Sequence, residues 1–211
     1  MGGVLFVVMP FCGVERPQIG VSTLKTALLQ RGIPCEIAYL NIPFAESLGF
    51  ETYGWITNNY SYEVFAGEWV FARELFSDSE IHHQEYVDEV LVRYGSFDRE
   101  KLDRVSRMAN LVPPFMDYCM RAVEWERYSM VGFTSTFEQN LPSLLLAKRL
   151  KERYPKLLIA MGGGNCGGEM GVQLHKSFPF LDFVFTGEAD QCFPEMAQRL
   201  GRGDTNFADM K

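Results

Sequence analysis

Residues 4–42 decide the fold, and they read VLFVVMPFCGVERPQIGVSTLKTALLQRGIPCEIAYLNI. Residues 4–9 are an unbroken apolar run rich in valine, as expected for a parallel strand that is covered on both faces. Apolar residues at helical spacing and the stop signal Gly32 then predict a helix over residues 20–31. Residues 33–42 have the composition of a second strand. The stretch therefore predicts one βαβ unit.

The same alternation returns later in the chain. Each expected strand is followed by one expected helix: 130–134 by 140–153, 157–161 by 169–176, and 181–185 by 192–200. Asn140 is the expected N-cap of the first of these helices. Strands that alternate with single helices imply right-handed crossovers and a parallel sheet. The sequence thus predicts an α/β fold with a doubly wound five-stranded parallel sheet, in the flavodoxin-like order 2-1-3-4-5.

Residues 43–127 interrupt this alternation, because a crossover between parallel strands needs only about a dozen residues. Helix-forming residues with apolar spacing recur in three segments, residues 63–76, 85–94 and 98–110. Pro113 and Pro114 are expected to end one helix and open the next. We therefore predict a helical insertion between the second and third strands, within one domain of residues 1–200. Its aromatic side chains have three possible roles: they cover a ligand, they form a contact surface for another domain, or they pack in an ordinary core.

Composition and charge exclude several classes of protein. An apolar content of 47% excludes intrinsic disorder, and a net charge of -7 without a basic stripe argues against a nucleic-acid partner. The apolar run near the N-terminus has the length of a strand, which argues against a secretory signal and against a membrane partner. Five cysteines without a CxxC pair argue against disulfides and a structural zinc site. We therefore expect a cytoplasmic location.

The glycine-rich turn after the fourth expected strand has three interpretations. Gly162, Gly164 and Gly167 formally match the GxGxxG signature of dinucleotide-binding domains. That signature belongs on the first strand of a βαβαβ half, whereas only one expected strand follows it here. The turn is otherwise a tight turn at a strand end, or a surface where a flat organic ligand lies on backbone that carries no Cβ atoms.

Hydroxyl and thiol groups also lie at expected strand ends. Thr134, Ser135 and Thr136 offer three hydroxyls to the polar part of a ligand, or they cap the next helix. Cys12 and Cys166 lack a neighbouring base that would make either of them a nucleophile, and a small buried side chain is the favoured reading. The sequence predicts no catalytic residue and no metal ligand.

Four segments in chain order carry a resemblance to a known family. RPQIG (16–20) with the helix LKTALLQRG (24–32), VGFTSTF (131–137), MGGGNCGGE (161–169) and FTGEAD (185–190) resemble the strand ends of cobalamin-binding domains in radical S-adenosylmethionine enzymes. TSTFEQN (134–140) and GEWVFA (67–72) resemble the subgroup that matures ribosomally made peptides. Chains of this subgroup are often described as similar to magnesium-protoporphyrin IX monomethyl ester oxidative cyclase.

The resemblance implies a position for the cofactor. The corrin would lie against the strand ends, with its nucleotide tail between the sheet and one helix layer. The Thr134, Ser135 and Thr136 hydroxyls would meet the tail, residues 162–164 would accommodate its base, and residues 187–188 would close the rim. The full set of implied cofactor-binding residues is Cys12, Arg16, Pro17, Gly20, Thr134, Ser135, Thr136, Gly162, Gly163, Gly164, Asn165, Gly187 and Glu188.

Two motifs of the family are absent from this sequence, and their absence changes what the resemblance implies about the cobalt ligand and the iron–sulfur cluster. The cobalt-ligating DxHxxG motif is absent, so the cobalamin would be base-off without a histidine ligand. The CxxxCxxC motif is also absent, so S-adenosylmethionine and a [4Fe–4S] cluster would belong to a C-terminal radical S-adenosylmethionine domain of the same polypeptide. Residues 201–211 would begin the linker to that domain.

The implied parent reaction is a methyl transfer, or a reaction like that of the oxidative cyclases, on a peptide or other small-molecule substrate. Two alternatives stay open. One is a non-catalytic docking module that has kept the fold and lost the cofactor, and the other is a dinucleotide-binding domain.

Overall fold

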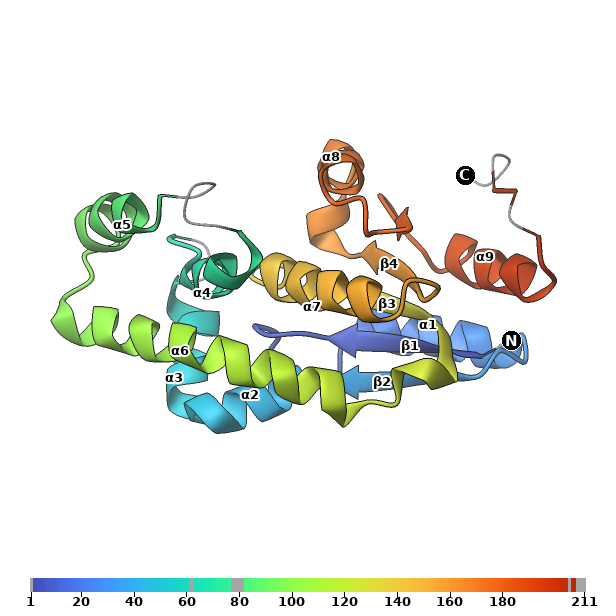
Figure 1. The fold of residues 1–211 in the computed structure, drawn as a ribbon, viewed down its shortest axis with the longest axis horizontal. Coiled ribbons are helices and arrows are strands. Elements are labelled where there is room, and N and C mark those ends of the chain that lie inside the picture. Colours follow the sequence, from blue (N-terminus) through green and yellow to red (C-terminus); the bar gives the residue numbers. More distant parts are fainter. Residues whose placement is uncertain (1, 61–62, 77–81, 205, 208–211) are drawn as a thin grey trace.

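The computed structural model describes residues 2–60, 63–76, 82–204 and 206–207. Within them lies one five-stranded sheet of order β2-β1-β3-β4-β5, in which every pairing is parallel. The strands are β1 (Gly3–Val8), β2 (Cys35–Tyr39), β3 (Tyr128–Thr134), β4 (Leu158–Gly162) and β5 (Phe183–Val184). The predicted fold class and strand order are confirmed (Figure 1).

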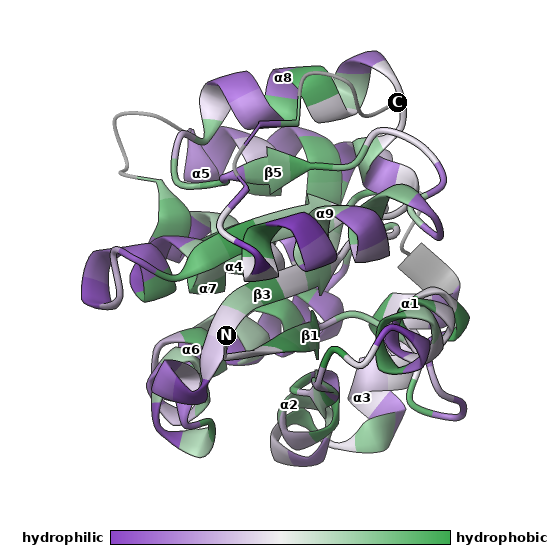
Figure 2. Cartoon of the chain, turned by 90° about the vertical axis from the view of Figure 1, so that its right-hand side faces the viewer, coloured by the Kyte–Doolittle hydropathy of each residue, from purple (hydrophilic) through white to green (hydrophobic). Residues whose placement is uncertain are grey.

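Side chains that alternate along β1 build two separate cores, one on each face of the sheet. Val4, Phe6 and Val8 pack with α1 (Ile19–Gln30) and α9 (Cys192–Gly201). Leu5 and Val7 belong to a larger core formed with α4 (Ala66–Leu75), α6 (Arg99–Ala122) and α7 (Asn140–Arg153). In Figure 2 the strands are mostly green, whereas the outward side of α9 is purple. We call the face of the sheet that is covered by α1 and α9 the α1–α9 face, and the face that is covered by α4, α6 and α7 the insertion face.

The segment between β2 and β3 is helical, as predicted. Besides α4 and α6 it contains α2 (Asn41–Leu48), α3 (Phe50–Trp55), α5 (His83–Glu85), the π-helical segments η1 (Ile56–Tyr60) and η2 (Tyr86–Tyr94), and the 3-10 turn η3 (Trp125–Arg127). The three segments predicted to be helical coincide with α4, η2 and the first part of α6. The arrowheads of β1 and β2 in Figure 1 point toward α3 and α4, so part of the insertion lies at the carboxyl ends of the strands.

The prediction that Pro113 and Pro114 separate two helices is wrong. Both prolines lie inside α6, which runs without interruption from Arg99 to Ala122. Two prolines remove the amide donors that would reach the carbonyls four residues earlier, which ordinarily breaks a helix. Here buried side chains before and after the prolines, among them Val112 and Phe115, belong to one core. Tertiary packing therefore outweighs the local cost.

Two further boundaries differ from the predictions. The second strand ends at Tyr39, and α2 begins at Asn41, so the insertion starts slightly earlier than expected. The predicted N-cap Asn140 is the first residue of α7, and the capping position, Gln139, makes no side-chain cap hydrogen bond. The missing cap is supplied by Glu68 from the insertion, which sequence spacing cannot reveal.

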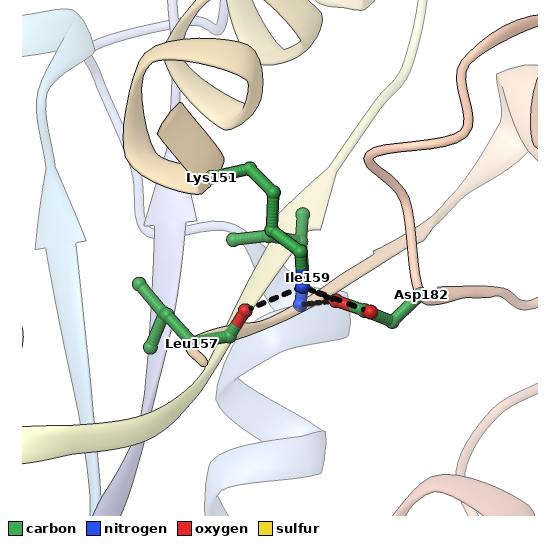
Figure 3. A network of polar contacts seen from close by, with 4 residues as sticks. All are labelled: Lys151, Leu157, Ile159 and Asp182. Carbon is green, nitrogen blue, oxygen red and sulfur yellow. Dashed lines mark hydrogen bonds and ion pairs between the residues drawn. The ribbon is translucent and has the colours of Figure 1, made fainter. Parts of the chain in front are cut away.

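The edge strand β5 is held by a polar network at the amino ends of the strands (Figure 3). The Lys151 ammonium lies 2.7 Å from the Asp182 carboxylate and also donates to the carbonyl of Leu157 at 2.9 Å. The same carboxylate accepts from the backbone N–H of Ile159 at 2.7 Å. A lysine of α7 therefore joins β4 to the segment that leads into β5.

Length and hydropathy give a separate result for the helices. None of those described combines the length and the apolar composition that crossing a membrane requires. The segment expected to begin a linker, residues 201–211, is only partly described: α9 ends at Gly201, and the Phe207 ring packs edge-on against Phe183.

Candidate functional site

A cavity of about 150 Å³ opens at the carboxyl ends of the strands on the α1–α9 face. It lies between the sheet and the two helices, where α1 begins and where the chain passes from β5 to α9. Its walls are apolar side chains and glycine backbone, contributed by Phe6, Val21, Leu24, Phe133, Ala160, Met161, Phe185, Ala189 and Phe193 together with Gly20, Gly132, Gly162, Gly163 and Gly187. Cavities of about this size in protein cores admit an aromatic ring.

The glycines around this cavity differ in what their missing side chains leave free. A Cβ atom added at Gly20 or Gly187 would meet nothing within 4 Å. At Gly132 it would lie 2.8 Å from the Phe6 ring, and at Gly163, where φ is +105°, it would lie 2.5 Å from the Ser135 carbonyl oxygen. Gly163 is therefore required by backbone conformation, whereas Gly20 and Gly187 leave open space at the cavity.

The N-terminus of α1 borders the same cavity without a cap. Gln18, the residue before the helix, makes no side-chain cap hydrogen bond, and the first turn contains no acidic residue. The first backbone N–H groups of a helix lack intrahelical partners and attract anions. Glu188 and Asp190 also line the cavity, and its lining includes no lysine and no arginine. The apolar walls therefore suit an uncharged flat ring, and the uncapped N–H groups at the start of α1 would favour an anionic group there.

The three hydroxyls after β3 have different surroundings. Thr134 lines the cavity. Ser135 is fully buried; its hydroxyl donates to Asn140 Oδ1 at 2.6 Å and accepts from Asn165 Nδ2 at 2.9 Å. Thr136 is half-buried, and its backbone N–H donates to Gln139 Oε1 at 3.2 Å. Of the three hydroxyls predicted to meet a ligand, the one at Thr134 lies at the cavity, and the Ser135 hydroxyl holds the turn together.

The glycine-rich turn after β4 is tied to the turn after β3. Asn165 donates its backbone N–H to the Ser135 carbonyl at 3.1 Å and its side-chain amide to the Phe137 carbonyl at 2.6 Å. The 3-10 turn η4 (Gly164–Cys166) follows β4, and α8 (Glu169–Ser177) begins only after Gly168, whose φ is +53°. In a dinucleotide signature the glycines lead directly from strand to helix, so this geometry departs from that interpretation.

The turn after β1 borders two other cavities. Arg16 and Pro17 are exposed and line a groove of about 720 Å³ beside the insertion and a smaller cavity of about 210 Å³. Cys12 is buried, and its Sγ accepts from Gln18 Nε2 at 3.0 Å. The Tyr53 hydroxyl, from the insertion, donates to the Cys12 carbonyl at 2.6 Å. We call the cavity between the sheet and helices α1 and α9 the glycine-edged cavity. Of the residues in this turn that the family resemblance assigns to cofactor binding, only Gly20 lines it.

Three buried thiols are unsuited to nucleophilic chemistry. Burial raises the pKa of Cys12 above its ordinary value, that of Cys35 to about 12 and that of Cys166 to about 11. A cysteine nucleophile reacts as the thiolate, so these shifts reduce reactivity. Among the described residues, no three His, Cys, Asp or Glu side chains gather as a metal site would require. Neither finding points to a reactive group in the described part of the chain.

A second polar cluster was not predicted. Glu138, in the turn after β3, is 1% exposed, and Glu68, in the first turn of α4, lies beside it. Both residues occur within sequence segments that carry the family resemblance, TSTFEQN and GEWVFA. Gly132 was also missed as a lining residue, although an isolated glycine inside a strand is a signal of close packing.

Comparison with protein-family models, with curated proteins and with solved structures finds no match to this chain.

Proposed function

We propose that this chain is the cobalamin-binding domain of a radical S-adenosylmethionine enzyme. One observation carries the proposal: a cavity edged by glycines lies between the sheet and the α1–α9 layer, at the carboxyl ends of the strands. In doubly wound sheets, ligands bind outside those strand ends. The family resemblance gives the same position to the nucleotide tail of cobalamin.

The residues present fit that tail. Gly20 and Gly187 leave space that a Cβ atom would occupy, and Phe185 and Phe193 provide apolar walls for a flat base. The uncapped N-terminus of α1 would receive the phosphate of the tail. Gly162 and Gly163 would form the floor beneath the base, and Glu188 would lie at the rim.

The chain's own contribution would be binding and orientation. Cobalamin, when bound, supplies a transferable methyl group. The cavity would exclude water from the base, and the turns after β1, β3 and β4 would orient the corrin. The radical chemistry, S-adenosylmethionine and the [4Fe–4S] cluster would belong to a further domain, acting on a peptide or other small-molecule substrate.

The test is binding of hydroxocobalamin to the purified chain. We expect a change in the visible spectrum on titration and pigment that stays with the protein through gel filtration. FMN and NAD⁺ serve as rival ligands, and thermal stabilisation by either of them without stabilisation by cobalamin would favour the dinucleotide interpretation. Absence of binding by all three would favour a docking module that has lost its cofactor.

A matched pair of variants locates the site. Gly187→Leu adds a side chain at a residue that lines the cavity, where a Cβ atom would meet nothing within 4 Å and φ is not positive, so binding should fall at least about tenfold. Gly54→Ala, in α3 and outside the cavity lining, should bind cobalamin as the wild type does. Equal affinity in both variants would place the ligand elsewhere.

A further inference from the structure

Two segments far apart in the sequence cap each other's helices. The Glu138 carboxylate accepts hydrogen bonds from the backbone N–H groups of Gly67 and Glu68, at the start of α4. The Glu68 carboxylate accepts from the backbone N–H of Asn140 at 2.7 Å and of Leu141 at 2.6 Å, at the start of α7. Each helix N-terminus is therefore capped by a carboxylate that the other segment carries.

The fit at this junction requires glycine at position 67. A Cβ atom there would lie 2.5 Å from Phe11 Cδ2 and would also overlap the Glu138 carboxylate. The next residue of α4, Glu68, provides the reciprocal cap, and Trp69 stacks on Tyr86 with ring centroids 5.6 Å apart. The junction gives a structural reason for the first residues of the GEWVFA segment, which the proposed cofactor site does not use.

The capped turn is continuous with the walls of the glycine-edged cavity. The backbone carbonyl of Glu138 accepts from the Phe11 backbone N–H at 3.3 Å, and Gln139 Nε2 donates to the Met9 carbonyl at 3.0 Å. Ser135, at the start of the turn, donates its backbone N–H to the Gly162 carbonyl at 2.8 Å. Residues 135–140 thus connect α4 of the insertion to the ends of β1 and β4, beside Thr134 at the cavity.

The junction holds two carboxyls without a cation. Within the described part of the chain, neither Glu68 nor Glu138 forms an ion pair, and Glu138 Oε1 is buried without a hydrogen-bond partner. Among the described residues, the titratable groups that interact at this junction are the two carboxyls themselves and Tyr86 of η2, whose hydroxyl donates to the Val64 carbonyl. Ionising both carboxyls would place two negative charges in one buried site.

We propose that Glu68 and Glu138 are positioning residues, through which the insertion holds the turn of residues 135–140 at the cavity, and that the turn loosens when both carboxyls are ionised. The geometry of the junction is independent of any ligand; only the effect on cobalamin rests on the proposed function.

The direction of the pH effect follows from the two carboxyls. Burial raises the pKa of Glu68 to about 7, and burial together with the charge of Glu68 raises that of Glu138 to about 8. The folded state thus holds protons that the unfolded state has already released above its ordinary carboxyl pKa. The stabilisation is fully present below that ordinary value, and it is lost as the pH rises through 7 and 8.

Amide hydrogen exchange tests the junction directly. The readout is the protection of the Gly67, Glu68, Asn140 and Leu141 amides between pH 6 and pH 9, corrected for base-catalysed intrinsic exchange. We expect protection to fall at least about tenfold over this range, because one unit of pKa shift corresponds to a tenfold difference. A pH-independent profile, or a loss of protection shared equally by the Val7 amide in the sheet, would overturn the proposal.

Variants separate positioning from mere packing. Glu138→Gln keeps an oxygen acceptor but cannot ionise, so the four amides should stay protected at pH 6 and lose less protection toward pH 9 than in the wild type, with the remaining loss coming from Glu68. Glu138→Ala should lose protection at every pH. Glu46→Gln, on the exposed side of α2, should match the wild type. A Glu138→Gln variant that retains the wild-type pH profile would overturn the proposal even if the alanine variant fails to fold.

The link to the cavity needs a second readout, the affinity for methylcobalamin at pH 6 and pH 9. We expect weaker binding at pH 9 than at pH 6 in the wild type, and a smaller difference between the two pH values in Glu138→Gln. Absence of binding at both pH values would refute the proposed function, while the exchange data would still decide whether the junction titrates. Binding that is equal at both pH values, with a junction that titrates, would overturn the coupling to the site.

Discussion

The two faces of the sheet differ in how densely side chains pack against them. The insertion face carries a dense aromatic cluster, in which the Phe44 and Phe115 rings are 4.8 Å apart and the Phe11 and Phe71 rings 6.2 Å apart. The α1–α9 face is covered by two helices and keeps a cavity of about 150 Å³ at the strand ends. The cavity proposed for the ligand therefore lies on the face with the simpler cover, whereas aromatic rings fill the core of the opposite face.

The difference also defines a role for the insertion. Tyr53 and Phe71 are buried in the core of the insertion face, and Trp55 and Trp69 pack against that core. These aromatic side chains therefore belong to the core, as one of the interpretations from sequence expected. The insertion approaches the cavity indirectly, through the turn that Glu68 and Glu138 hold.

The largest expected effect on stability comes from removing a buried aromatic ring from the core of the insertion face. Phe71→Ala should lower the free energy of unfolding by about 4 kcal/mol, because a fully buried ring is lost from a close-packed cluster. Phe193→Ala, on the cavity face, should cost about 3 kcal/mol, because part of that ring already borders open space. Urea unfolding measures both. A larger cost for Phe193→Ala would reverse the assignment of the denser face.

The next effect in size comes from the junction between the faces. Gly67→Ala should destabilise the fold by about 3 kcal/mol, because the added methyl group overlaps Phe11 and the Glu138 carboxylate. Gly54→Ala, in α3, is the control, because its added Cβ atom would lie at an ordinary contact distance of 3.7 Å from Asn58 Nδ2. The higher helix propensity of alanine should raise its free energy of unfolding by up to about 1 kcal/mol. Similar unfolding midpoints for the two variants would show that position 67 tolerates a side chain.

A smaller effect is expected from pH. The raised pKa values of Glu68 and Glu138 mean that the stability contributed by the pair declines as the pH rises from 5 to 9. Denaturant titrations at several pH values should show this decline in the wild type and a shallower one in Glu138→Gln. A steeper decline in the variant would show that another group causes the pH dependence.

The smallest effect is expected at the edge of the sheet. Asp182→Asn removes the ion pair between Asp182 and Lys151, whose two side chains are each less than a third exposed. The substitution should lower the free energy of unfolding by about 1 kcal/mol. Because this network leads into β5, amide exchange should quicken in Val184 and Phe185 more than in β1. Unchanged exchange at β5 would show that strand pairing alone fixes the wall of the cavity.

The sequence predicts the sheet well, because its signals are local. The apolar run of β1 and the stop at Gly32, whose φ is +72°, are each readable within a few residues, and they lead directly to the strand order. The pair Pro113 and Pro114 misleads, because the packing that holds α6 together comes from distant parts of the chain.

The site is predicted only in part, for a similar reason. Gly20, Thr134, residues 162–163 and residues 187–188, which the family resemblance assigns to cofactor binding, line the cavity, but the sequence cannot show that the Ser135 hydroxyl is used inside the turn. The junction of Glu68 with Glu138 joins segments whose proximity exists only in the folded chain.

The central claim is that the cavity on the α1–α9 face takes the nucleotide tail of cobalamin. Cobinamide has the same corrin without that nucleotide, so a comparison of the two affinities by calorimetric titration tests the claim most directly. Burial of the base should make cobalamin bind about 100-fold more tightly, an advantage that Gly187→Leu should remove. Equal affinity for cobalamin and cobinamide in the wild type would contradict the account.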